Sequence, residues 1–542
     1  MNRSAPRLAP TTHRAPRWAA PLLALALLFA LAGCGSLPQN VERPRSQALA
    51  EPGATALGRL AAQRRPADVR AGESGFALVD SADMAYASRL ALTRQAGKTL
   101  DIQYYAIHAD ASTAELLREV RAAAARGVRV RILLDDFNST GQNALVMRMA
   151  FLPGVEMRMF NPLPGGRGAG VLRALGSLHD FQRMQHRMHN KLYIADNAWG
   201  ITGGRNLGDA YFGTADGSNF IDMDVLAVGP VVRAMSASFD RYWNHPLAYP
   251  VQSLITPAEL RALREAVRGP PGAGPGGPDD PAPPATAPAA KPPPSLPPPL
   301  DLAALPLVWA PAALLVDEPA KLVPELNDEH SEDTVVDGLL SLMQGARRQV
   351  LIVSPYFVPG QRMMQVFADL RRRGVRVRVL TNSLASNDAP LAHVGYARYR
   401  EDLIRLGVEL YEMRALHSAH LDRTVFGSGA GGSKASLHSK ILIIDDRVIG
   451  IGSMNLDLRS KLQNTEVALV IRSAALSRQA TAELEDALDD SVWRVELTPE
   501  GRLWWRAPPG AAFEDAHGEP DASLGLRLLL KLLGPLAPDE LL

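Results

Sequence analysis

Short apolar runs alternate with amphipathic stretches along most of the chain, and this pattern predicts an α/β fold. Residues 101–105 and 128–134 have the apolar alternation and continuous apolar runs of strands that enter a core. Between them, residues 113–125 show the Ala- and Leu-rich spacing of a helix. Residues 191–194 and 440–444 are short apolar runs that indicate buried strands. Strands that alternate with helices predict an α/β sandwich.

Several pieces of sequence occur twice, which indicates a duplicated domain. Arg126-Gly-Val-Arg-Val-Arg131 recurs as Arg373-Gly-Val-Arg-Val-Arg378, and Gly154-Val-Glu156 recurs as Gly407-Val-Glu409. Their nearly constant offset of about 250 residues is typical of a repeat that covers a whole domain. The sequence therefore predicts two equivalent α/β sandwich domains, with the natural place for an active site at their pseudo-two-fold interface.

Composition divides the chain further. Residues 269–300 are nearly all Pro, Ala and Gly, and they cannot bury enough apolar surface to order themselves. We expect five segments, which are a signal peptide (1–33), a flexible tether (34–72), the first domain (73–268), a disordered linker (269–300) and the second domain with a C-terminal extension (301–542).

The first 33 residues have the pattern of an export signal. Four arginines precede an apolar run, residues 18–32, that is too short for a comfortable membrane span and ends in Leu31-Ala-Gly-Cys34. This pattern resembles a bacterial lipoprotein signal, and the resemblance implies cleavage before Cys34 and lipidation of that residue. Gly35 follows, where Asp would usually retain a lipoprotein at the inner membrane, so either membrane of the envelope remains open. The alternative is a buried, inert cysteine behind an ordinary signal anchor.

Two copies of a short motif carry the candidate chemistry. His189-x-Lys191-x4-Asp196 is followed by Gly203-Gly-Arg-Asn206, and His438-x-Lys440-x4-Asp445 is followed by Gly452-Ser-Met-Asn455. In both copies, six residues separate the aspartate from the glycine. A single copy recurs by accident, but two copies with the same trailing pattern point to one site that uses two histidines and two lysines.

These repeats resemble the phospholipase D superfamily, whose defining element is this doubled motif. Further stretches resemble its bacterial cardiolipin synthase branch, in particular the C type, over roughly residues 75–250 and 301–542. They include Leu100-Asp-Ile-Gln-Tyr-Tyr105, Gly203-Gly-Arg-Asn-Leu-Gly-Asp-Ala-Tyr-Phe212, Val394-Gly-Tyr-Ala-Arg398 and Asn464-Thr-Glu466. The resemblance implies a catalysed exchange at a phosphodiester.

The residue types suit that chemistry. A neutral histidine is nucleophilic, and its ordinary pKa of about 6.5 lets a second histidine donate a proton near neutral pH. By the resemblance, His189 is the nucleophile and His438 is the general acid and then the base. Lys191 and Lys440 would neutralise the equatorial oxygens, and Asn206 and Asn455 would donate further hydrogen bonds to them. No metal or other cofactor is needed, because these side chains take the electrophilic role.

Each histidine also needs a carboxylate that fixes its tautomer. Glu466, in Glu466-Val-Ala-Leu-Val470, and Asp224, in Asp224-Val-Leu-Ala-Val228, occupy matching places. The family resemblance assigns each to the histidine of its own half, with Asp224 preferred over Asp222. Asp196 and Asp445 are expected to be structural and to tie a strand to its turn.

Charge and composition leave three interpretations of function. The net charge of +1 gives no overall attraction to nucleic acid, so no nucleic-acid partner is expected. The first interpretation is a phosphatidyltransferase that makes cardiolipin from phosphatidylglycerol and a second phospholipid, either phosphatidylglycerol or phosphatidylethanolamine, through a phosphohistidine. The second is a phospholipase D-type hydrolase. The third is a silent lipid binder at the membrane surface, and the intact motifs argue against it.

The end of the chain has its own signal. Residues 524–533 are Leu-rich and include Arg527 and Lys531. Such a segment suits an amphipathic helix that lies on a membrane. A terminal helix that docks on the core has the same composition, and both alternatives stay open. With a lipidated Cys34, we expect the protein to be anchored on the periplasmic side of a bacterial cell envelope.

Overall fold

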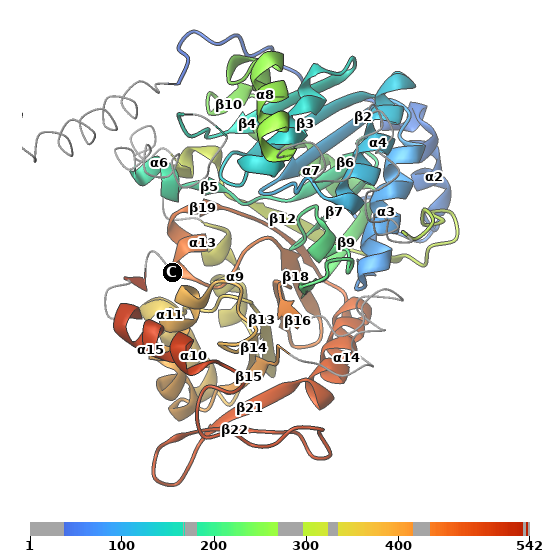
Figure 1. Cartoon of the computed structure of the whole chain (residues 1–542). Coiled ribbons are helices and arrows are strands. Elements are labelled where there is room, and N and C mark those ends of the chain that lie inside the picture. The colour runs from blue at the N-terminus through green and yellow to red at the C-terminus, as the bar shows by residue number, and fades with distance from the viewer. Residues whose placement is uncertain are drawn as a thin grey trace, which may run out of the picture.

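Two sheets of nine strands each organise the chain, as a computed structural model shows (Figure 1). The structure describes residues 37–165, 167, 181–268, 296–322, 334–415, 434–534 and 538–539. The first sheet has the strand order β10-β4-β3-β2-β6-β7-β9-β1-β11, and the second has the order β12-β20-β18-β17-β13-β14-β15-β21-β22. The expected pair of α/β domains is therefore confirmed, and the two halves lie one above the other in Figure 1.

The first half contains the following elements: η1 (Pro52–Ala54), α2 (Ala56–Arg64), β1 (Ser74–Val79), α3 (Ala82–Gln95), β2 (Thr99–Tyr104), α4 (Ala111–Ala125), β3 (Arg129–Asp135), η2 (Gly141–Phe151), β4 (Val155–Phe160), α6 (Phe181–Gln185), β5 (Arg187–Met188), β6 (Leu192–Ala195), β7 (Trp199–Gly203), η4 (Asp209–Tyr211), β8 (Ser218–Ile221), β9 (Asp224–Val228), α7 (Pro230–Trp243), β10 (Ala248–Pro250), η5 (Val251–Ser253), α8 (Pro257–Arg268) and β11 (Val308–Ala310).

The second half contains the remaining elements: β12 (Ala312–Val316), η6 (Pro319–Leu322), α9 (Val335–Gln344), β13 (Gln349–Val353), α10 (Gly360–Arg372), β14 (Arg376–Asn382), α11 (Pro390–Arg405), β15 (Glu409–Met413), β16 (Lys434–Leu437), β17 (Ile441–Ile444), β18 (Val448–Gly452), α13 (Leu458–Leu462), β19 (Asn464–Thr465), β20 (Val467–Ile471), α14 (Ala474–Asp490), β21 (Val492–Leu497), β22 (Leu503–Arg506) and α15 (Leu524–Leu533).

The duplication is visible in the order of the strands. Read from opposite ends, β4-β3-β2-β6-β7-β9-β1 of the first sheet matches β15-β14-β13-β17-β18-β20-β12 of the second. In both halves, the first three of these strands are parallel and the next is antiparallel to its neighbour. The repeat seen in the sequence is therefore a repeat of topology.

A shared core lies between the two sheets. On β6, Leu192 and Ile194 face this shared core, whereas Tyr193 and Ala195 face the core under the outer helices. On β17, Ile441 and Ile443 face the shared core too. Helices α7 and α14 contribute side chains to the same cluster. Because apolar surface from both halves is buried together, the halves are held in one orientation.

The motif aspartates hold strand ends in place, as expected from the sequence. Asp196 is buried and accepts hydrogen bonds from the backbone N–H groups of residues 97, 98 and 99, just before and at the start of β2. Asp445 accepts from the N–H groups of residues 347, 348 and 349 at the start of β13. Both aspartates have positive φ angles, 54° and 53°, in the turn that follows the motif strand.

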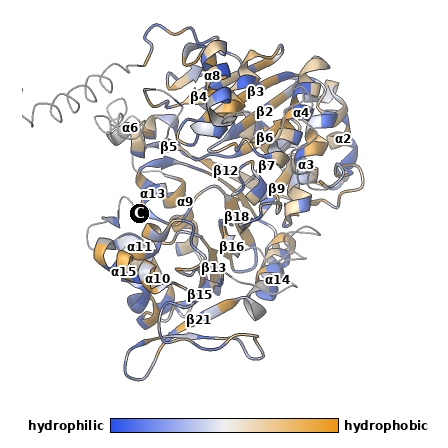
Figure 2. Ribbon diagram, viewed as in Figure 1, coloured by the Kyte–Doolittle hydropathy of each residue, from blue (hydrophilic) through white to orange (hydrophobic). Residues whose placement is uncertain are grey.

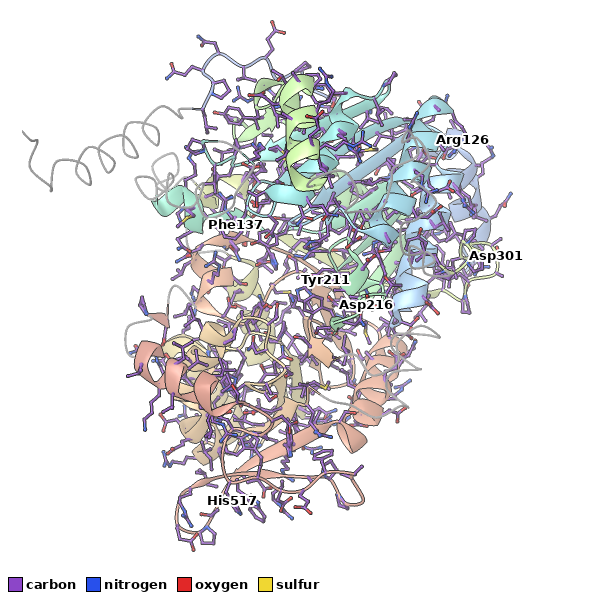
Figure 3. All side chains as sticks on the ribbon, viewed as in Figure 1. Arg126, Phe137, Tyr211, Asp216, Asp301 and His517 are labelled. Atoms are coloured by element: carbon purple, nitrogen blue, oxygen red, sulfur yellow. The ribbon has the colours of Figure 1, made fainter. Side chains whose placement is uncertain are left out.

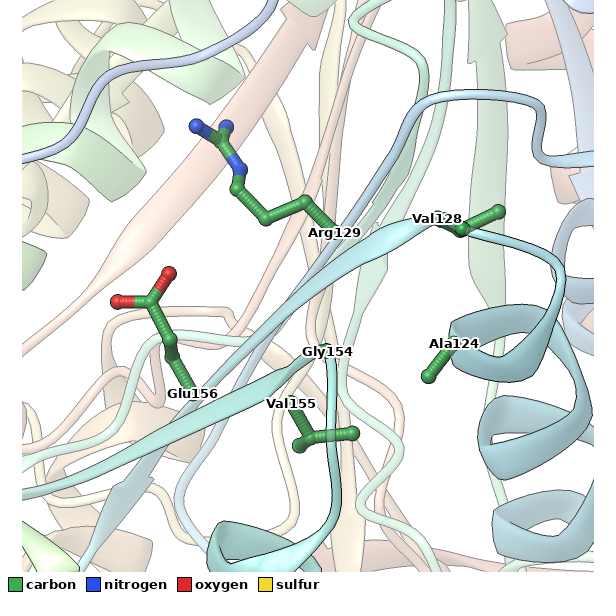
Figure 4. Close-up of a pocket in the computed structure, with 7 residues that line it drawn as sticks. Ala124, Val128, Arg129, Gly154, Val155 and Glu156 are labelled. Carbon is green, nitrogen blue, oxygen red and sulfur yellow. The ribbon is translucent and has the colours of Figure 1, made fainter.

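The repeated Arg-Gly-Val-Arg segment lies at the opposite end of the sheet from the motif histidine and lysine, at the end where Asp196 holds the start of β2. It leads into β3 and lines a shallow depression together with Ala124 and residues 154–156 (Figure 4). At the other end of β3, Asp135 accepts a hydrogen bond from the backbone N–H of Met188, next to His189. This repeat therefore serves the strand start, not the chemistry.

The expectation of a flexible tether over residues 34–72 is wrong for its described part. Leu57 of α2 is only 1% exposed, and its carbonyl accepts a hydrogen bond from Trp199 Nε1 at 3.0 Å. Upstream, the N–H of Ala48 donates to Asp240 of α7 at 2.7 Å. Leu57 is part of the first domain's core, and Leu60 and Ala61 pack against that core, so α2 is fixed to the domain.

The expected boundary at residue 301 is also displaced. β11 pairs with β1 at the edge of the first sheet, and Leu302 and Leu305 belong to the first domain's core. The second sheet begins at β12, so the halves meet near Pro311. Linker residues 269–295, the expected signal peptide and Cys34 lie outside the described residues. Within the part of the chain that is described, no helix is long and apolar enough to cross a membrane.

Candidate active site

Two short parallel strand pairs cross from one half to the other and bring the motifs together. β5 pairs with β19, with Met188 opposite Thr465, and β16 pairs with β8, with Leu437 opposite Ile221. The ladders continue into the histidines, because the N–H of His189 donates to the Thr465 carbonyl at 2.9 Å. The N–H of His438 likewise donates to Ile221 at 2.7 Å. Both motif histidines therefore sit where the halves meet.

Each histidine binds a carboxylate from the other half. His189 Nδ1 lies 2.9 Å from Glu466 Oε2, and His438 Nδ1 lies 2.6 Å from Asp222 Oδ2. The assignment of each carboxylate to the histidine of its own half is therefore wrong. The crossing ladders explain the exchange, since Glu466 follows Thr465 directly and Asp222 follows Ile221.

The preference for Asp224 over Asp222 is wrong as well. In the first sheet Gly203 is opposite Asp224, and in the second Gly452 is opposite Ala468, so Asp224 corresponds to Ala468. Glu466, two residues earlier, corresponds to Asp222. The partner of His438 can be found from the residue opposite the motif glycine by counting back two positions, which leads to Asp222. Matching the apolar sequences that follow each acid leads to Asp224 instead.

Asp224 has a different, structural environment. Its carboxylate binds Arg89 Nη2 at 2.8 Å and lies 3.5 Å from Arg205 Nε, with all three side chains buried. This cluster fixes α3 to the end of β9. Asp224 therefore stabilises the domain behind the site and does not contact a motif histidine.

The two carboxylates are held differently. Glu466 accepts hydrogen bonds from the hydroxyl groups of Ser453 and Ser460 in addition to its contact with His189. The first half has Gly204 in place of Ser453, and a Cβ atom there would lie 2.4 Å from Asp222 Oδ1. The second half thus combines the longer Glu466 with Ser453, and the first half combines the shorter Asp222 with Gly204. The two pairs fill equivalent spaces beside the histidines.

Electrostatics also separate the two acids. Burial raises the pKa of Asp222, and the positive charge of Lys440 opposes this effect without cancelling it. Burial acts on Glu466 too, but the His189 ring, Lys191 and the Ser453 hydroxyl together hold the pKa of Glu466 below its ordinary value. Glu466 is therefore the more firmly ionised of the two.

Burial favours the neutral form of both histidine rings. They are only 8% (His189) and 5% (His438) exposed, and burial lowers the pKa of His189 to about 4 despite the opposing charge of Glu466. Burial and then the charge of Lys440 lower the pKa of His438 well below its ordinary value. With Nδ1 bound to a carboxylate, each ring presents Nε2 as its reactive nitrogen.

Aromatic rings line both histidines. Tyr105 contacts His189 edge-on with ring centroids 5.0 Å apart, and Tyr211 contacts His438 in the same way at 5.3 Å. Phe220 lies 5.0 Å from the His438 ring. Tyr211 appears at the boundary between the halves in Figure 3, and Phe137, which stacks on Tyr105, appears further along the same boundary. These rings fix the imidazole planes and exclude water.

Both motif lysines are buried beside the histidines. Lys191 Nζ donates to the His189 carbonyl at 2.8 Å, and Lys440 Nζ donates to the His438 carbonyl at 2.6 Å. Burial lowers the pKa of Lys191 to about 7, with Glu466 opposing and Lys440 adding to the effect. Burial lowers the pKa of Lys440 to about 8, with Asp222 and Glu466 opposing. An anion placed between these ammonium groups would restore their full charge.

The motif asparagines are buried at the same site. Asn206 Nδ2 donates to the Tyr211 hydroxyl at 2.9 Å, and its Oδ1 accepts from the Ala106 N–H. Asn455 Oδ1 has no hydrogen-bond partner among the described residues, although it is fully buried. An amide oxygen only accepts hydrogen bonds, so this atom could accept from a hydroxyl group of a ligand, while Asn455 Nδ2 is the atom that could donate. In the described part of the chain, no group of three His, Cys, Asp or Glu side chains could hold a metal ion.

Exchanging one oxygen for nitrogen should separate the roles of the two aspartates. Asp222→Asn replaces the carboxylate that orients His438 with a neutral amide, which no longer fixes the tautomer of the ring or stabilises its protonated form. We therefore expect turnover of a chromogenic phosphodiester to fall by roughly 10²–10⁴-fold with little change in Tm. Asp224→Asn leaves Arg89 and Arg205 without their shared counter-charge, and we expect a loss of about 3–5 kcal/mol of unfolding free energy. Turnover and thermal melts on both variants check this. Loss of turnover in Asp224→Asn at an unchanged Tm, with Asp222→Asn active, would contradict it.

Anion affinity should depend on the lysines' protonation. Sulfate stays a dianion from pH 6 to 9, whereas Lys191 and Lys440 lose their protons as the pH rises through about 7 and about 8. We expect calorimetric sulfate affinity to fall by at least about tenfold over this range, since two charges that hold the anion are lost. Lys191→Met and Lys440→Met should each bind more weakly at pH 6 and show a flatter dependence. A wild-type affinity that does not change with pH would disprove the assignment.

Comparison with known proteins agrees with this geometry. The family described as cardiolipin synthase, PLD-like domain, matches residues 90–243 and 339–488, one match in each half. The chain is 35% identical over 474 residues to cardiolipin synthase C of Escherichia coli (strain K12), covering 87% of this chain and 97% of that protein. It is 30% identical over 502 residues to an uncharacterized protein of Helicobacter pylori (strain ATCC 700392 / 26695), covering 93% and 96%.

Among solved structures, the phosphatidylserine synthase of Haemophilus influenzae Rd KW20 superposes with a TM-score of 0.55. The superposition covers 90% of this chain and 98% of that one at 14% sequence identity, so it bears on the fold alone. Since the family matches both repeats and a relative matches nearly end to end, the chain belongs to the phospholipase D superfamily, in its cardiolipin synthase branch.

Proposed function

We propose that this protein is a phosphatidyltransferase that forms cardiolipin from phosphatidylglycerol and a second phospholipid through a phosphohistidine. One observation carries the proposal. Two neutral histidines, each oriented by a carboxylate of the other half, share a buried site with two lysines, in a chain similar over most of its length to cardiolipin synthase C. This arrangement supplies two nitrogen bases and a cationic cradle, which suits two successive displacements at one phosphorus.

In the first displacement, His189 Nε2 attacks the phosphorus of the donor phospholipid. The bond from phosphorus to the headgroup oxygen breaks, and His438 gives its proton to that oxygen, so the headgroup alcohol leaves. The bound diester brings a negative charge to the site, which favours the protonated form of His438 that this step requires. Lys191 and Lys440 neutralise the phosphoryl oxygens, and Asn206 and Asn455 donate further hydrogen bonds.

In the second displacement, His438 takes the proton of the terminal hydroxyl of phosphatidylglycerol. That oxygen attacks phosphorus, the bond to His189 breaks, and cardiolipin leaves. Tyr105, Tyr211 and Phe220 around the rings favour a lipid alcohol over water as the acceptor, because they limit the space for free solvent. With water as the acceptor, the same residues would make phosphatidic acid.

Lipid products test the proposal directly. Purified protein receives phosphatidylglycerol alone or together with phosphatidylethanolamine, and the products are identified by mass spectrometry. We expect cardiolipin with the native chain and none with His189→Ala, and a requirement for phosphatidylethanolamine would identify it as the donor. In acid-quenched samples, peptide mapping should find the phosphatidyl adduct on His189 and not on His438. Phosphatidic acid without cardiolipin would instead establish a hydrolase, and neither product would reject both activities.

We further propose that the mature chain begins at a lipidated Cys34 on the periplasmic side of the cell envelope. The apolar run before Leu31-Ala-Gly-Cys34 supports this, and a lipid anchor would hold the site beside its substrates. The intact mass of the purified protein should equal residues 34–542 plus a diacylglyceryl group and an acyl chain. Cys34→Ala should retain residues 1–33. A native chain that keeps residues 1–33, or lacks the lipid mass, would disprove the anchor.

A further inference from the structure

The C-terminal helix α15 has apolar residues on two opposite faces. Seven of its ten residues are leucine, and it stands out as a hydrophobic element at the edge of the molecule in Figure 2. Leu524, Leu528 and Leu532 are exposed by 74%, 63% and 74%, and Leu529 by 51%. Isolated exposed leucines are ordinary, but a row of them on one helix face marks an interaction site.

The inner face fixes the helix to the second domain. Leu526 and Leu530 pack against Leu384, Val394 and Ala522 in a small core of their own. The Ser523 side chain caps the first turn by accepting from the Leu526 N–H at 3.2 Å. At the other end, Arg398 of α11 donates to the Gly534 carbonyl at 2.6 Å. The helix is therefore held in one orientation, and its core-docking face is already occupied.

The outer face is a continuous stripe. Leu524, Leu528 and Leu532 follow at intervals of four residues, so they lie in a row on the side opposite Leu526 and Leu530. Lys531 is exposed beside this row, and residues 522–534 contain no acidic side chain. Leu391, 46% exposed, lies on α11 one turn before Val394, which packs under α15.

A series of contacts connects α15, which carries the stripe, to the active site. Leu384, which supports α15, follows Asn382 by two residues, and the Asn382 side chain bonds both the N–H and the carbonyl of Leu437, next to His438. In the same segment, Asp388 accepts from the Tyr356 hydroxyl at 2.8 Å. Burial lowers the pKa of Lys440, and Asp388 is one of the charges that oppose this effect. The segment from Asn382 to Asp388 thus joins the helix to the motif.

We propose that α15 is a membrane-docking helix whose outer leucines insert into the headgroup–acyl boundary of a phospholipid bilayer and hold the active site against its lipid substrates. This inference rests on the proposed function for the presence of a lipid substrate. Ten residues span about 15 Å, half of a bilayer's hydrocarbon core, so the helix can lie in the interface but cannot cross it. Lys531, which is exposed beside the leucine row, adds attraction to an anionic lipid surface.

Insertion depth tests the proposal without reference to activity. Full-length Leu528→Cys and, as the matched control, Arg121→Cys on the exposed side of α4 carry an environment-sensitive dye, and the unsubstituted chain gives the blank for Cys34. In vesicles of phosphatidylglycerol and phosphatidylethanolamine with spin-labelled acyl chains, we expect quenching at least about threefold stronger at position 528 than at position 121. Equal quenching would overturn the proposal. A spectral shift at 528 that grows with protein concentration in detergent would instead assign the stripe to a second copy.

Activity then separates docking from chemistry. We expect Leu524→Gln/Leu528→Gln/Leu532→Gln, which keeps good helix formers, to make cardiolipin at the native rate in detergent micelles and at least about fivefold more slowly on vesicles. Leu342→Gln on α9, an exposed leucine elsewhere, should match the native chain in both. A triple variant as active as the native chain on vesicles would overturn the proposal. If the native chain makes no cardiolipin in either medium, the proposed function fails while the quenching result still decides the docking.

Discussion

The active site depends on the pairing of two short strands from each half across the interface. The pair of β5 with β19 is only two residues long, and the pair of β16 with β8 is only four. Their register nevertheless decides which carboxylate contacts which histidine. Parallel pairing places consecutive residues side by side, so the residue after Thr465 meets the residue after Met188. The apolar core shared by the two sheets supplies the free energy that keeps these short ladders in register. The chemistry therefore exists only when both halves have folded and docked, since neither half contains a complete histidine–carboxylate pair.

Burial of four ionisable side chains at this interface is tolerated because the charges balance. Lys191 and Lys440 lie beside Asp222 and Glu466, and burial lowers the pKa of both lysines and both histidines, so that little excess positive charge is buried. Isolated buried charges are costly, but charges that are paired and hydrogen-bonded are much less so. A phosphodiester adds one negative charge to this balanced site, and the imidazoles are the groups that can take up a compensating proton. In the proposed mechanism, binding of the substrate would therefore favour protonation of the general acid.

Much of the fold and the motif could be predicted from the sequence, because both depend on local patterns. The strands around residues 101–105 and 128–134 and the helix at 113–125 follow from apolar periodicity, and the duplication follows from the repeated strings. The histidine partners could not be predicted in this way, since residues 222 and 438 pair only through the docking of the halves. The sequences Asp224-Val and Glu466-Val look alike, but Asp224 and Glu466 occupy places in their sheets that differ by two residues. The segment at 37–72 was misjudged because Leu57 and backbone hydrogen bonds such as that from Ala48 to Asp240 hold it, and neither gives a periodic pattern.

The duplicated halves are not equivalent, and the differences bear on how one site performs two opposite steps. A perfectly symmetric pair of histidines would have no physical reason to divide the roles of nucleophile and proton donor. Here Glu466 receives two serine hydroxyls and stays firmly ionised, whereas Gly204 lets the shorter Asp222 approach His438 with a raised pKa. In the proposed mechanism, a fixed anion behind His189 would support the positive charge that forms on a ring bonded to phosphorus. A less firmly ionised acid behind His438 would leave that ring free to give up its proton and take it back. The glycine at position 204 against the serine at 453, together with the shorter Asp222 against Glu466, therefore makes the surroundings of the two histidines unequal.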